Sequence, residues 1–131
     1  MAIVTGLVGE IVVVVQPADT ADALGNKGLH VLATPRLVAL LELAAIRAVE
    51  PHLPTGGRTV GTRIDVRHLA ATPVGMRATI RATLREVDGR RLVFDIEGHD
   101  EVERIVEGQH ERFQIDQARF LARIAAKGRP A

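Results

Sequence analysis

Three residues of this chain combine side-chain types and positions that could act on a carbonyl group: Thr34, Glu42 and His68. A carboxylate can attack a carbonyl or activate water, and an imidazole can carry a proton to or from a reacting group. A hydroxyl at the start of a helix lies where free N–H groups favour a developing negative charge. Together these groups are the parts needed to add water to a carbonyl.

Glu42 is notable because it interrupts an apolar helix. The stretch Thr34–Glu50 (TPRLVALLELAAIRAVE) opens on Thr-Pro, with Thr34 as the expected N-cap and Pro35 in a position where its missing N–H costs nothing. At roughly 100° per residue, Glu42 lies about 120° from Arg36, among apolar neighbours. A carboxylate in such surroundings is costly unless it is paired or used.

His68 lies on the apolar face of a predicted strand. From Thr59 the pattern has a period of two, so that His68 is in phase with Ile64 and Val66 while charged residues alternate with them. This apolar face is the one expected to pack on the long helix. His68 and Glu42 therefore lie on two elements predicted to meet, either within one subunit or across a dimer.

Each of the three residues also has an ordinary structural interpretation. Thr34 is by default a helix cap. Glu42 could pair with an arginine across a dimer interface, and an isolated histidine on an apolar face is more often a hydrogen-bonded core residue. The residues alone leave these alternatives open.

Composition excludes several classes of function. The 131 residues predict one domain, 1–131, and a net charge of +1 with three aromatic residues gives no case for nucleic acid. There is no cysteine and no serine, and the histidines lack metal-ligand spacing, so we expect neither a serine or cysteine nucleophile nor a metal. The apolar run Ile3–Val15 contains Glu10, which favours a strand over a membrane span. We therefore expect a cytoplasmic location.

The elements that must position these residues follow from periodicity and turn signals. We expect strands at Leu7–Gln16, Thr59–His68, Met76–Arg85, Leu92–Ile96 and Glu103–Ile115, a loop at Pro17–Gly28, a hairpin at Asp88-Gly89, a turn from His99-Asp100, a bulge near Gly108, and a C-terminal helix Gln117–Lys127 capped by Asp116. This order predicts an α+β fold in which a curved antiparallel sheet wraps around the long helix. One sheet cannot cover the whole helix, so we expect a homodimer to bury the rest.

The sequence also resembles a known family. The segment GTRIDVRHLAATPVG (61–75), with Ala33-Thr34 and Glu42 upstream, and the segments VDGRRL (87–92) and GQHER (108–112) resemble the fluoroacetyl-CoA thioesterase family of hot-dog-fold enzymes. The resemblance extends from about residue 31 to residue 120. It implies the hot-dog fold, a dimer with sites at its interface, and hydrolysis of a short-chain acyl-CoA without a cofactor.

By this resemblance Thr34, Glu42 and His68 correspond to the catalytic residues, Gly61 to a glycine that approaches the thioester, and Arg112 to a substrate-contacting arginine. Two other functions stay open: a non-catalytic acyl-CoA-binding hot-dog module, and a hot-dog enoyl-CoA hydratase or lyase. The family has aromatic residues just before the long helix, whereas the segment 22–32 here has none. The sequence therefore leaves the acyl group unnamed.

Overall fold

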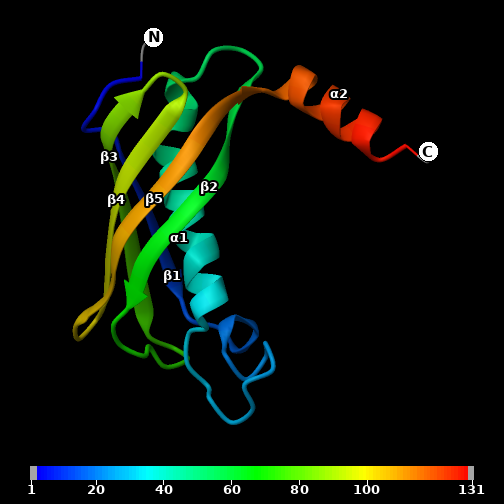
Figure 1. Cartoon of the computed structure of the whole chain (residues 1–131). Helices are drawn as coiled ribbons and strands as arrows, with labels where there is room; N and C mark the ends of the chain where they lie inside the picture. Colours follow the sequence, from blue (N-terminus) through cyan, green and yellow to red (C-terminus); the bar gives the residue numbers. More distant parts are fainter. Residues whose placement is uncertain (1–2, 130–131) are drawn as a thin grey trace.

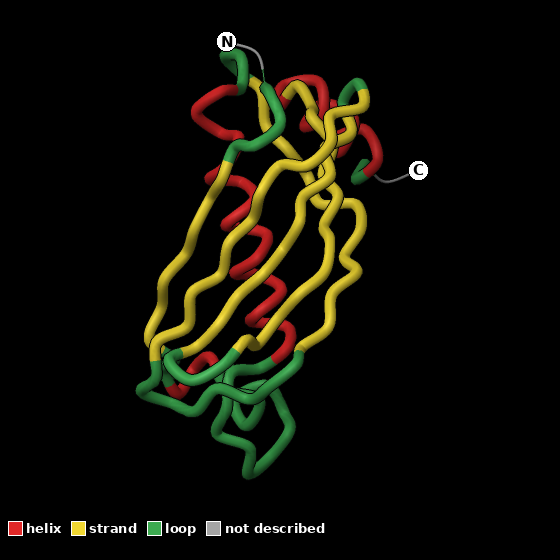
Figure 2. The backbone as a smooth tube through the Cα atoms, turned by 90° about the vertical axis from the view of Figure 1, so that its left-hand side faces the viewer, coloured by secondary structure: helices red, strands yellow, loops and turns green. Residues whose placement is uncertain are grey.

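One antiparallel sheet and one long helix make up the body of the molecule (Figures 1 and 2). The computed structural model describes residues 3–129. In chain order the elements are β1 (Val8–Val14), α1 (Thr34–Val49), β2 (Gly57–His68), β3 (Arg77–Asp88), β4 (Arg91–Asp100), β5 (Arg104–Asp116) and α2 (Gln117–Lys127), with short 3₁₀ turns at Pro17–Asp19 and Glu50–His52. The strand order is β1-β3-β4-β5-β2, so β1 and β2 are the two edges. The predicted α+β arrangement of one antiparallel sheet and a long helix is confirmed.

The core forms between α1 and the inner face of the sheet. Strand β3 shows the predicted alternation most clearly. Its residues Ala78, Ile80, Ala82 and Leu84 are buried, whereas Arg77, Arg81 and Arg85 on the other face are exposed. The apolar side chains of α1 that face the sheet are also buried: Leu37, Leu40, Leu41, Ala44, Ala45, Ala48 and Val49. Burial of side chains of this size supplies most of the stabilising free energy of such a domain.

Strand β1 makes the closest approach to the helix, at Gly9. A Cβ on Gly9 would lie 2.0 Å from the carbonyl oxygen of Ala44 and 2.6 Å from the amide nitrogen of Ala48. Only glycine fits at this crossing, and the small alanines of α1 provide the other half of the contact.

Helix α2 forms as predicted, from Gln117 to Lys127, and Asp116 caps it by accepting a hydrogen bond of 3.0 Å from the amide of Arg119. In Figure 1 this helix extends away from the sheet beyond the end of β5. No helix within residues 3–129 is long and apolar enough to cross a membrane, and the cytoplasmic location stays a prediction.

Three local expectations were wrong. Thr34 is not the N-cap of α1: Ala33 occupies that position, and the Thr34 hydroxyl bonds a side chain instead. His99 and Asp100 end β4 rather than begin a turn. The irregularity of β5 lies at Ile105 rather than at Gly108, because the register against β4 shifts there while Gly108 pairs in register with both neighbouring strands.

The side of α1 that the sheet does not cover remains apolar. Ala39 is exposed and Leu43 is 39% exposed, while Val38 and Ile46 are half-buried. Next to this side lies β2, an edge strand of 12 residues. A long unpaired edge beside an apolar helix face is a liability for a monomer. The homodimer expected from the sequence stays a prediction.

Candidate active site

The structure brings Thr34 and His68 together at the beginning of α1. Thr34 is the first helical residue and His68 is the last residue of β2. The Thr34 hydroxyl oxygen lies 2.8 Å from Nδ1 of His68. A hydroxyl hydrogen-bonded to an imidazole in this way fixes the orientation of the ring.

The second ring nitrogen of His68 is not used by Thr34. Its Nε2 is buried and has no hydrogen-bond partner among residues 3–129. Burial lowers the pKa of His68 below its usual value, and the backbone of Ala70 only partly offsets this effect. The imidazole is therefore neutral at pH 7, and an uncharged ring with a free nitrogen can exchange a proton with a bound molecule.

A pocket opens beside this pair. It has a volume of about 330 Å³ and is lined largely by aliphatic side chains from the segment before α1 and from the end of β2: Ala21, Asn26, Leu29, Val31, Leu32, Ala33, Thr34, His68, Leu69, Ala70 and Ala71. The lining contains neither a carboxylate nor a Lys or Arg side chain. An apolar group of modest size suits such a pocket.

Glu42 lies two turns further along α1 and pairs with Arg112 of β5. Its Oε2 accepts a hydrogen bond of 3.3 Å from Nη1 of Arg112, and its side chain is 38% exposed. The arginine itself is only 4% exposed. Glu42 is thus the accessible partner of a buried cation, and the two groups belong to the same chain.

Arg112 is held from three directions. Its Nε donates to the Thr59 hydroxyl at 2.8 Å, Nη2 donates to the Thr59 carbonyl at 2.9 Å, and Nη1 lies 3.1 Å from Nε2 of His110. Burial lowers the pKa of Arg112, whereas Glu42 acts in the opposite direction. The Arg112 guanidinium nevertheless stays a cation, because arginine is not deprotonated in proteins.

Gly61 of β2 faces the Glu42 carboxylate. A Cβ at Gly61 would lie 2.6 Å from Oε2 of Glu42 and 3.2 Å from both Nη1 of Arg112 and Cε1 of His110. The register of β2 against β5 shifts between Gly61 and Arg63, so Thr62 is an extra residue in β2. In a regular strand, Gly61 and Val66 would lie on opposite faces because they are five residues apart. The extra residue places both on the face that packs on the helix.

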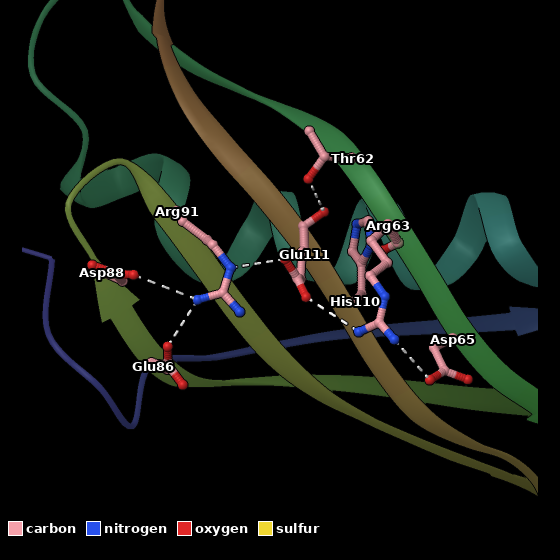
Figure 3. A network of polar contacts seen from close by, with 8 residues as sticks. All are labelled: Thr62, Arg63, Asp65, Glu86, Asp88, Arg91, His110 and Glu111. Carbon is pink, nitrogen blue, oxygen red and sulfur yellow. Dashed lines mark hydrogen bonds and ion pairs between the residues drawn. The ribbon is translucent and has the colours of Figure 1, made fainter.

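The outer face of the sheet carries a polar network behind this site (Figure 3). Glu111 accepts hydrogen bonds from Arg91 (2.9 Å) and from Arg63 (3.2 Å), and these arginines lower the pKa of its carboxyl. Arg63 also pairs with Asp65 at 3.2 Å. Exposed pairs contribute little individually, but this network joins β2, β5 and β4 at the register shift.

Within one chain the predicted catalytic residues form two separate groups. Thr34 bonds His68, whereas Glu42 lies with Arg112 and Gly61. Eight residues of helix separate Thr34 from Glu42, which is about 12 Å along the axis. The roles expected for Thr34, His68, Glu42, Gly61 and Arg112 stay predictions. Their division into two groups within one chain was not expected from the sequence.

Sequence reasoning missed Thr59 and His110, which hold Arg112. The alternation of β5 contains a signal for the second, because His110 and Arg112 are two residues apart on a strand and so share a face. No group of three or more His, Asp or Glu side chains within residues 3–129 is arranged to hold a metal ion.

Comparison with solved structures identifies the class of fold. The chain superposes on a fluoroacetyl-CoA thioesterase with a TM-score of 0.89 at 36% identity, covering 99% of this chain and 100% of that one. A mutant of that enzyme in complex with acetyl-CoA gives a TM-score of 0.91 at 36% identity, over 97% and 100% of the two chains. A thioesterase superfamily member from Thermus thermophilus gives 0.87 at 28% identity, over 95% and 93%. A hot-dog-like protein from Thermanaerovibrio acidaminovorans gives 0.89 at 22% identity, over 97% and 94%, and this likeness confirms the predicted hot-dog fold.

Sequence comparison narrows this class to a family. The family model described as fluoroacetyl-CoA-specific thioesterase matches residues 15–118. The curated fluoroacetyl-CoA thioesterase of Streptantibioticus cattleyicolor is 44% identical over 98 residues, which are 75% of this chain and 70% of that protein. The chain belongs to the fluoroacetyl-CoA-specific thioesterase family and is an acyl-CoA thioester hydrolase. The resemblance inferred from the sequence motifs is confirmed, and with it the thioesterase function over its two alternatives.

Proposed function

We propose that the enzyme hydrolyses a short-chain acyl-CoA at a composite site built from two copies of the chain. One protomer supplies Thr34 and His68, and its partner supplies Glu42. The observation that carries this proposal is the separation of Glu42 from the Thr34–His68 pair within one chain, combined with the exposed side of α1 and the free edge of β2 beside both groups.

Strand geometry supports this arrangement. Gly61, beside Glu42, and His68 are seven residues apart on β2, which is about 23 Å along an extended strand. Suppose that β2 pairs antiparallel with the same strand of a second copy, about a two-fold axis near Ile64 and Asp65. Gly61 then lies opposite the partner's His68, and Glu42 comes close to it.

The proposed chemistry assigns one task to each group. The Glu42 carboxylate acts on the thioester carbonyl, as the nucleophile or as the base that activates water. His68 is held by Thr34 through Nδ1; it takes up the proton that water releases, directly or by way of Glu42, and passes it through Nε2 to the leaving thiolate. Gly61 leaves room for the thioester. Arg112 orients Glu42; because Arg112 is buried, this role is better supported than the direct substrate contact expected from the resemblance.

The pocket beside Thr34 and His68 suits an uncharged acyl group better than an anionic one, because its lining is largely aliphatic and contains no cationic side chain. A panel of acyl-CoA thioesters with detection of free thiol tests this. Acetyl-, propionyl- and butyryl-CoA should be turned over with higher kcat/KM than malonyl- or succinyl-CoA. A preference for the dicarboxylic thioesters would contradict the assignment.

Complementation between two inactive variants tests the composite site. Glu42→Gln and His68→Ala should each lower kcat by about 10²-fold or more, since each removes an acid–base or nucleophilic group. When the two variants are co-expressed, a mixed dimer contains one intact site, and random pairing should restore about one quarter of the wild-type activity. A site confined to one protomer gives no recovery, and unchanged turnover in both variants would overturn the catalytic roles altogether.

A further inference from the structure

Behind Arg112 lies a histidine that the proposed mechanism does not use. His110 is fully buried, and its ring stacks on Phe94 with the ring centroids 6.2 Å apart. We propose that His110 is a positioning residue, a neutral hydrogen-bond acceptor that holds the Arg112 guanidinium and thereby orients Glu42. This inference rests on the proposed role of Glu42 in hydrolysis.

The contacts of His110 determine its protonation state. Nδ1 lies 2.8 Å from the carbonyl oxygen of Arg63, which can only accept, so Nδ1 carries the hydrogen. Nε2 lies 3.1 Å from Nη1 of Arg112, and a guanidinium can only donate, so Nε2 carries none. Both contacts are satisfied together only by the neutral Nδ1–H tautomer.

Burial and the Arg112 cation favour the same neutral state, and they outweigh the carboxylates of Glu42 and Glu111, which act in the opposite direction. The cation of Arg112 faces Nε2, and the carboxylates of Glu42 and Glu111 are the nearest opposite charges. Burial lowers the pKa of His110, the carbonyl of Arg63 opposes this, and Arg112 lowers it further. A protonated His110 would place a second donor against Nη1 of Arg112 and break the contact.

Nη1 of Arg112 is shared between two acceptors. One hydrogen bond goes to Nε2 of His110 and the other to Oε2 of Glu42. Without the histidine, one N–H of a 4% exposed guanidinium loses its acceptor, and only the two bonds to Thr59 still hold the group beside Glu42. His110 therefore determines the direction in which Arg112 presents its second hydrogen.

The position of His110 depends in turn on Arg63, which lies directly after the register shift of β2. The side chain of Arg63 is tied to Glu111 and Asp65 on the outer face of the sheet, while its carbonyl accepts from His110 (Figure 3). One residue thus connects the outer network to the inner chain of hydrogen bonds that ends at Glu42.

Two substitutions at His110 separate positioning from simple packing. His110→Asn keeps an amide donor near Nδ1 for the Arg63 carbonyl but loses the acceptor for Arg112. His110→Gln places a carbonyl oxygen near the position of Nε2 and so keeps that acceptor. We expect kcat to fall by about 10- to 100-fold in the Asn variant, as for a lost hydrogen bond to a charged group, with KM within about two-fold. The Gln variant should keep kcat within about three-fold of the wild type.

A measurement on the unmodified protein tests the tautomer without reference to activity. Two-bond ¹H–¹⁵N correlation spectra of ¹⁵N-histidine-labelled protein should show His110 as neutral with the proton on Nδ1 at pH 7. The Nε2–H tautomer or an imidazolium there would overturn the inference. This experiment remains decisive if the Asn variant fails to fold.

The kinetic outcomes distinguish this inference from the proposed function. Wild-type turnover in Glu42→Gln would overturn the proposed function, whatever the His110 variants do. Loss of turnover in Glu42→Gln with full kcat in His110→Asn would overturn only the positioning role. The positioning role would also be overturned if the Asn and Gln variants lost the same amount of kcat and the same amount of melting temperature. Packing alone would then explain the effect of substituting His110.

Discussion

The contact at Gly61 makes the most specific prediction. Replacing this glycine by alanine adds a Cβ that would lie 2.6 Å from Oε2 of Glu42. The backbone of Gly61 has no positive φ, so alanine meets no conformational penalty there. The largest displacement therefore falls on the Glu42 carboxylate, while the contacts with Arg112 and His110, at 3.2 Å, tighten by only a few tenths of an ångström.

The size of the effect follows from the distances. Moving Oε2 from 2.6 Å to an ordinary contact of 3.4 Å requires a shift of about 0.8 Å. The hydrogen bond from Arg112 is already 3.3 Å long and would not survive such a shift. A displacement of about 1 Å at a reacting group costs about 10²-fold in rate. We expect kcat of Gly61→Ala to fall by about that factor.

Stability should hardly change in the same variant. The displaced atom is the end of a flexible, 38% exposed side chain, and alanine restricts the unfolded chain more than glycine does. We expect the free energy of unfolding to stay within about 1 kcal/mol of the wild type, measured by urea denaturation.

Gly98 of β4 provides a matched control. A Cβ there would lie 2.8 Å from Cγ1 of Val106 and 2.9 Å from the carbonyl oxygen of Thr79, inside the sheet and away from Glu42. Gly98→Ala should cost about 1–3 kcal/mol of stability while the folded enzyme keeps its kcat. The reasoning is refuted if Gly61→Ala retains wild-type kcat, or if both variants lose stability and activity in the same proportion.

Three further predictions concern other groups. Thr34→Val removes the hydroxyl that holds His68 and should lower kcat by about 10-fold, whereas Thr34→Ser should retain most activity; equal rates in a thiol-release assay would argue against the pair. Burial lowers the pKa of His68 and of His110, so the unfolded chain binds more protons and stability should fall as the pH drops below about 6.5. Urea midpoints from pH 7 to 5 measure this loss, which should shrink in His110→Gln and would be absent if both imidazoles were charged in the folded protein. Burial opposes ionisation of Asp100, but hydrogen bonds from two backbone amides and from Thr72 outweigh it and lower the pKa of Asp100, so Asp100→Ala should cost about 1–3 kcal/mol of stability with kcat unchanged.

The fold was predictable because its main signals are local. The apolar run of α1 bounded by Pro35 and Glu50, the period-two pattern of β3 and the Asp116 cap each depend on residues close in sequence. The family motifs then added the tertiary arrangement that periodicity alone only suggests.

The organisation of the site was not predictable in the same way. The register shift after Gly61 leaves no mark in the sequence, because Thr62 suits an exposed strand position whether or not the strand is bulged. Thr34 was assigned as a cap because the sequence does not show that His68 lies within hydrogen-bonding distance. The pairing of Glu42 with Arg112 joins residues 70 positions apart, which only the folded chain brings together.

The crossing of β1 over α1 at Gly9 bears on the site although β1 contributes no side chain to it. The backbone of β1 lies directly on Ala44 and Ala48, and this contact sets the rotation of the helix about its own axis. At a radius of about 5–6 Å, a rotation of about 20° would move the end of a side chain by about 2 Å. Such a rotation would carry the Glu42 carboxylate away from Gly61 and Arg112 even with every residue of the site unchanged. Because Gly9 has no side chain, β1 can pack this closely on α1, and this close contact sets the angle at which Glu42 faces β2.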